Sequence, residues 1–167
     1  MTSAVGQYPS KRDARPGFCV ETIGTYSPED FSGILPKVRA AGIWVSEEIT
    51  PKRFSTLTVE ESQFRGYFLE LGLASVEADI DLDREFYLKC IVEEGWSPGG
   101  IEHLLAAIDF QMKSNEMRSI ISLRETASIH GNTCVPRLMF EDLDLIVTLY
   151  RDKKFLPGMR VIVVRKV

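Results

Sequence analysis

The sequence predicts an α+β protein, in which a twisted antiparallel sheet of about five to seven strands is covered by two main helices. Two observations lead to this class: apolar and polar residues alternate through much of the chain after Phe54, and two amphipathic helical patterns carry clear start signals. Hydrophobic residues make up 44% of the 167 residues and charged residues 26%, which is typical of a globular protein. We expect a single domain over residues 17–167 and a flexible arm over residues 1–16, where apolar side chains are few.

The first predicted elements are a short strand and a helix. Residues 18–23 alternate weakly, as in a strand. A helix is then predicted from Ser27 as N-cap and Pro28 as first helical residue, with Gly42 at the position that ends it. Pro36 lies inside this pattern and removes a backbone donor, so we expect a kink or a break into two shorter helices.

The next pattern admits two interpretations. Residues 76–83 alternate between apolar and acidic side chains, and residues 86–93 alternate again, so we favour a β-hairpin that turns near residues 82–84. The alternative is a helix over residues 84–94, capped by Asp83 and stopped by Gly95.

The second half of the chain predicts one helix and several strands. After Gly99 and Gly100 comes the most regular helical stripe: Ile101, Leu104, Leu105, Ile108 and Met112. Alternation returns beyond Asn115, with apolar residues at Leu143, Leu145, Val147 and Leu149 and again at Val161, Val163 and Val167. We interpret these last two runs as a terminal antiparallel hairpin, turning at Pro157 and Gly158.

Catalytic and cofactor motifs are absent from the sequence. It contains no nucleophile elbow, metal-ligand spacing or histidine cluster, so we expect no catalytic residue, no metal and no cofactor. Cys134 and His130 are a weak candidate for a catalytic dyad, and an incidental pair is the alternative. Residues 97–100 are a weak candidate for an anion site at a helix N-terminus, and a plain helix start is the alternative. We favour a non-catalytic binding or self-associating module, forming a homo-oligomer through edge strands and exposed aromatic side chains, namely Trp96, Tyr150 and Phe155.

Basic residues are concentrated at the end of the chain. After residue 150 there are six basic residues and one acidic residue, Asp152. A binding surface on the predicted terminal hairpin would contact a protein, nucleic acid or an anionic membrane through Arg151, Lys153, Lys154, Phe155, Arg160 and Lys166. A solvated edge strand protected by charges explains the same pattern.

The alternative function is a divalent-metal-dependent enzyme that uses the acidic strand Glu77 to Asp83. Carboxylates at every second position of a strand share one face and suit Mg²⁺, Mn²⁺ or Ca²⁺. However, neighbours on one strand face stand roughly 6.6–6.8 Å apart, which is too wide to grip one small ion without another element. A solvated outer strand face explains these residues equally well.

The three cysteines indicate a reducing compartment. Cys19, Cys90 and Cys134 form no C-x-x-C pair and lie among apolar neighbours, so we expect buried free thiols. No apolar stretch approaches the roughly 18–20 residues of a membrane span, and no secretory signal is recognisable. We therefore expect a soluble cytoplasmic protein.

Overall fold

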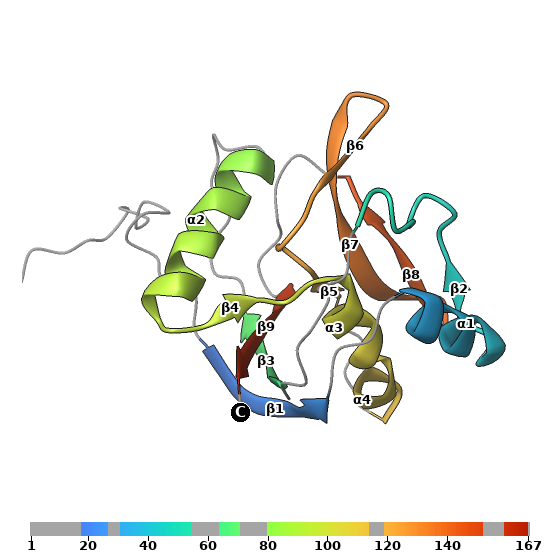
Figure 1. The fold of residues 1–167 in the computed structure, drawn as a ribbon, viewed down its shortest axis with the longest axis horizontal. Helices are drawn as coiled ribbons and strands as arrows, with labels where there is room; N and C mark the ends of the chain where they lie inside the picture. The colour runs from blue at the N-terminus through green and yellow to red at the C-terminus, as the bar shows by residue number, and fades with distance from the viewer. Residues whose placement is uncertain are drawn as a thin grey trace, which may run out of the picture.

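A mixed β-sheet forms the centre of the protein. The computed structural model describes residues 18–26, 31–54, 64–70, 80–113, 119–151 and 159–166, and the predicted arm over residues 1–16 lies outside them. Seven strands lie in the order β1-β3-β9-β5-β7-β8-β2, while β4 pairs with β9 and β6 with β7 (Figure 1). The strands are β1 (Phe18–Tyr26), β2 (Trp44–Val45), β3 (Phe64–Glu70), β4 (Ser97–Pro98), β5 (Ile120–Ile121), β6 (Ala127–Ile129), β7 (Asn132–Glu141), β8 (Asp144–Tyr150) and β9 (Arg160–Lys166).

The α+β class is confirmed, but the expectation of a wholly antiparallel sheet is wrong. β2 runs parallel to β8, and β5 runs parallel to β9, whereas the other pairs are antiparallel. The predicted terminal hairpin is also wrong, because β8 pairs with β7 and β2, and β9 pairs with β3, β4 and β5. Alternation shows which side chains point inward, but it carries no information about which strand lies alongside.

Helices cover both faces of the sheet, as Figure 1 shows. On one face, α1 (Phe31–Ala40), α3 (Ile101–Ala106) and α4 (Ile108–Lys113) share a core with strand residues that include Leu138, Val147 and Ile162. On the other, which we call the α2 face, α2 (Ile80–Glu93) shares a core with Val135, Tyr150, Val161 and Val163. α1 and the helices after Gly100 thus lie on the same face, whereas the helix on the second face was only the alternative interpretation.

The predicted hairpin over residues 76–93 is wrong from Ile80 onward, where α2 forms instead. Tyr87, Cys90 and Ile91 are buried at helical spacing, so one side of α2 packs on the sheet. Gly95 follows with φ of +81°, and the Trp96 N–H donates to the Ile91 carbonyl at 3.0 Å, which closes the helix end. The two apolar groups beside this bond, Trp96 and Ile91, belong to the same core.

α1 is one continuous helix through Pro36, so the predicted break into two helices is wrong. Pro36 is exposed and removes only the bond to the carbonyl of the first helical turn, four residues earlier. The end of α1 agrees with the prediction: Gly42 has φ of +82°, and the Ile43 N–H donates to the Val38 carbonyl at 3.3 Å.

The predicted helix after Gly100 is divided at Ala107 into α3 and α4. Ile101, Leu104, Leu105 and Ile108 are buried as expected, but Met112 is exposed and Gln111 is buried in its place. The turn at Ala107 shifts the helical phase, so the stripe reaches Ile108, the first residue of α4, but does not continue to Met112.

Replacing Gly42 by Ala tests the left-handed end of α1. Because no atom lies within 4 Å of the added Cβ, the penalty comes from the backbone alone, and we expect the free energy of unfolding to fall by about 1–2 kcal/mol in urea titrations. Gly42→Asn is the matched control and should lose less, since Asn tolerates positive φ. An Ala variant as stable as the wild type would contradict this helix end.

Candidate interaction surface

α2 leaves part of its sheet face uncovered. Trp44 pairs with Ile146 across β2 and β8, and Ile146 pairs with Met139 across β8 and β7, so the three side chains stand in one row. Trp44 is 55% exposed, and Ile146 and Met139 are partly exposed. Among the described residues, these three belong to neither core cluster. We call this apolar line across three strands the Trp44 row.

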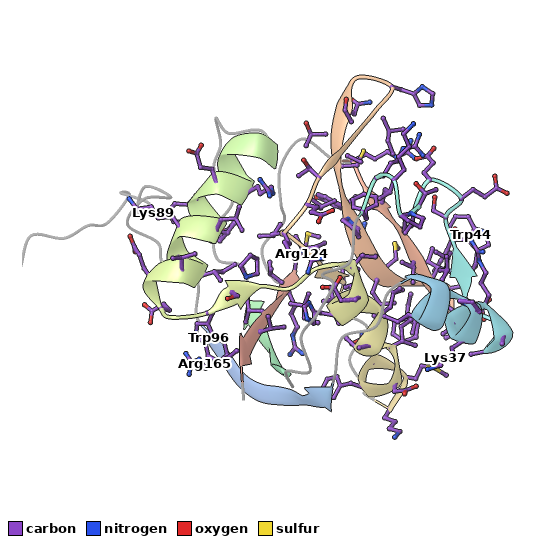
Figure 2. The ribbon with its side chains drawn as sticks, viewed as in Figure 1. Lys37, Trp44, Lys89, Trp96, Arg124 and Arg165 are labelled. Atoms are coloured by element: carbon purple, nitrogen blue, oxygen red, sulfur yellow. The ribbon has the colours of Figure 1, made fainter. Side chains whose placement is uncertain are left out.

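The period of the strands determines where the Trp44 row points. Val45, Val147 and Leu138, each next in sequence to one member of the row, are buried in the core beneath α1 and α3. Successive side chains of a strand point to opposite faces, so the row points to the α2 face. Figure 2 shows Trp44 at β2, on the far side of the molecule from Trp96 and Arg165.

Charged groups stand at both ends of this surface. Toward the β7–β8 turn, Glu141 pairs with Asp144 and both are exposed. In the other direction, Arg137 pairs with Thr148; the guanidinium donates to the Ser119 hydroxyl at 2.7 Å and lies 5.2 Å from the centre of the Tyr150 ring. Along β7, the α2 face is therefore acidic at Glu141, apolar at Met139 and basic at Arg137.

The structure separates the basic residues predicted as a binding surface. Arg151 is exposed and ion-paired with Glu48, whereas Arg160 is only 5% exposed. Lys166 ends β9 and pairs with Phe64 of β3. The three remaining candidates lie outside the described residues: Lys153, Lys154 and Phe155.

Of the three aromatic residues predicted to be exposed, one is buried, one is partly buried, and Phe155 lies outside the described residues. Tyr150 is buried in the core under α2. Trp96 is partly buried, with the Arg165 guanidinium 3.6 Å from its ring centre (Figure 2). Among the described residues, Trp44 is an exposed aromatic side chain that sequence reasoning missed, because it belongs to a strand of only two residues, which produces no alternating pattern.

A buried ionic cluster lies where α3 meets the segment after β5. Glu102 is buried, and its carboxylate accepts two hydrogen bonds from Arg124, one of them at 2.7 Å. The Arg84 guanidinium donates at 2.8 Å to the carbonyls of Leu123 and Arg124. The cluster thus ties α2, α3 and the segment after β5 together.

His103 completes this cluster and occupies the start of α3. Its Nδ1 accepts a hydrogen bond from the Gly100 N–H at 2.9 Å, so that amide is already bound within the protein. Burial lowers the pKa of His103 from 6.5 to about 4; Glu102 opposes this shift and Arg124 adds to it. The imidazole is therefore neutral at pH 7, as its role as acceptor requires. Residues 97–100 and His103 thus form a plain helix start, the alternative to the weak anion site.

The other weak candidates do not assemble into a reactive site. His130 is exposed in the β6–β7 turn, whereas Cys134 is buried and its thiol donates to the Asn132 carbonyl at 3.4 Å. Burial raises the pKa of the Cys134 thiol, the opposite of an activated nucleophile.

The acidic strand proposed for the alternative function is only partly described. Glu77 and Asp79 lie outside the described residues, and Asp81 and Asp83 belong to α2. Positions two apart on a helix stand roughly 200° apart around its axis, unlike the same-face ladder of a strand. Within the described part of the chain, no group of three or more His, Cys, Asp or Glu residues could hold a metal ion.

Comparison with known proteins adds no assignment: no family model matches the chain, and neither the curated proteins nor the solved structures contain a match. No helix among the described residues is long and apolar enough to cross a membrane.

The low pKa of His103 predicts acid sensitivity. The unfolded state, with a pKa near 6.5, takes up the proton first, so the stabilisation is complete above pH 6.5 and is lost as the pH falls toward 4. Between pH 7 and 4.5 this group alone should lower the free energy of unfolding by about 2 kcal/mol. The matched variant His103→Gln keeps an acceptor for the Gly100 N–H but does not titrate. Urea titrations should give it a shallower pH dependence, and identical slopes would contradict the prediction.

The Glu102–Arg124 pair should behave as a coupled unit. Glu102→Leu and Arg124→Met each leave an uncompensated charge in or near the core, at a cost of about 3 kcal/mol. The double variant removes both charges, so its loss should be clearly smaller than the sum of the single losses. Additive losses in urea denaturation would show that the two residues do not stabilise one another.

Proposed function

We propose that this protein is a non-catalytic module that acts through protein–protein contacts made by the Trp44 row. The observation that carries the proposal is the exposure of an apolar row on a sheet face that a helix covers only in part. Apolar patches left exposed with a polar rim mark interaction sites. Here Glu141, Asp144 and Arg137 form that rim.

The composition of the row supports the same proposal. Tryptophan and methionine are enriched at protein interfaces, and charged residues are depleted from their centres. At the nearby β7–β8 turn, Leu143 is 85% exposed and adds a further apolar group. Contacts of the basic residues with nucleic acid or an anionic membrane stay a prediction, since of these side chains Arg151 is paired with Glu48 and Arg160 is buried.

Trp44→Lys tests the proposal. Because Trp44 is more than half exposed, we expect the variant to fold with a free energy of unfolding within about 1 kcal/mol of the wild type. The matched control is Val92→Lys, a similar exposed apolar position on α2 that lies outside the row. The measurement immobilises the wild type and each variant and quantifies the proteins that each one captures. A tagged copy of this chain is included among the proteins offered.

The expected result is a set of partners retained by the wild type and by Val92→Lys but lost from Trp44→Lys. If folded Trp44→Lys captures the same proteins in the same amounts as the wild type, the row is not a contact surface and the proposal fails.

A further inference from the structure

We infer that the partner of the Trp44 row is a second copy of this chain, bound so that the two α2 faces pack against each other around a two-fold axis. This inference rests on the proposed function and names its partner. It is carried by the order of charges along the strands: acidic at Glu141 and Asp144, apolar in the row, and basic at Arg137.

This order makes the surface complementary to itself. Consider a two-fold axis that lies midway between the two sheets, directly over the Trp44 row and perpendicular to the strands. Rotation about this axis reverses the strand direction in the second copy. Glu141 of each copy then faces Arg137 of the other, and the two apolar rows meet in the middle. A surface that pairs with itself in this way gives a closed, isologous dimer.

The other simple arrangement is disfavoured by charge. An axis parallel to the strands would bring acidic end to acidic end: along β7 it places Glu141 opposite Glu141 and Arg137 opposite Arg137, and along β8 it places Asp144 opposite Asp144, so like charges repel. The first arrangement also places Asp144 opposite Thr148, whose hydroxyl is able to donate to the carboxylate. The charge pattern therefore selects one orientation.

The available space suits a second sheet. Sheets that pack face to face stand roughly 10 Å apart with their strands within about 30° of each other. A helix with its side chains is roughly 10–12 Å thick, so the sheet of the second copy would continue the layer that α2 begins over Val135 and Tyr150.

The experiment reverses one charge at a time and then combines the variants. Sedimentation of the full chain at up to about 100 μM should give a dimer for the wild type. Glu141→Arg and Arg137→Glu should each weaken dimerisation about tenfold or more, because each places like charges opposite one another. Glu85→Arg, at an exposed position of α2, and Arg39→Glu, at an exposed position of α1, are the matched controls and should dimerise as the wild type does.

An equimolar mixture of the two weakened variants is the decisive sample. In a mixed dimer, residues 137 and 141 carry opposite charges at both contacts, so the mixture should dimerise with near wild-type affinity. Since Arg137 also contacts Ser119 and Tyr150, its variant is checked for folding by thermal melting, and Glu141→Arg provides the test that does not disturb those contacts.

Three results would overturn the inference: a wild type that stays monomeric, a folded Glu141→Arg that dimerises normally, or a mixture of folded variants that does not dimerise. A monomeric wild type that still loses a different captured protein on Trp44→Lys would refute self-association while leaving the proposed function intact.

Discussion

β9 buries both of its faces, and the arrangement of the other elements follows from that constraint. Val161 and Val163 lie in the core under α2, while Ile162 lies in the core under α1 and α3. A strand of this kind requires neighbours on both edges and helices on both faces. It therefore takes β3 along one edge and β4 and β5 along the other, so the closing segment of the chain lies inside the sheet. α2 meets this need over β9 and β5 and does not extend to β2, which leaves the Trp44 row exposed.

The ionic cluster under α3 serves position more than stability. Removing Glu102 and Arg124 from water is costly, and a buried ion pair often stabilises no more than apolar side chains of the same volume. The pair instead fixes how α3 and the segment after β5 are oriented, because a guanidinium and a carboxylate form two hydrogen bonds in only one relative geometry. Arg84 adds to this by donating to the carbonyls of Leu123 and Arg124. Gly100 belongs to the same constraint, because a Cβ there would overlap the Arg124 guanidinium.

Local signals account for what could be predicted from the sequence. The helix that ends at Gly42 and the helix start after Gly100 carry caps and apolar spacing within a few residues, and both form. α2 was obscured because the acidic alternation before it resembles a strand, although Gly95 marked its true end. The neighbours of β8 and β9 are set by contacts between distant segments, which no local pattern encodes.

The candidate surface was missed for a related physical reason. The alternation through residues 143–149 indicates one apolar face of β8, yet Ile146 on the opposite face is apolar too. Ile146, an apolar residue at a position where the alternating pattern predicts a polar one, was the signal in the sequence for an exposed apolar surface. The burial of Arg160 could not be foreseen, because it depends on the helices that cover the face to which it points.

The brevity of β2 has a consequence for strand addition at its edge of the sheet. A sheet edge is a template for fibril growth, since unpaired main-chain groups accept strands from other molecules without limit. β2 consists of Trp44 and Val45 alone, so it offers only a minimal template at that boundary. The exposed apolar side chains of the Trp44 row lie on the face of the sheet instead, and the proposed two-fold contact there would close after a single partner.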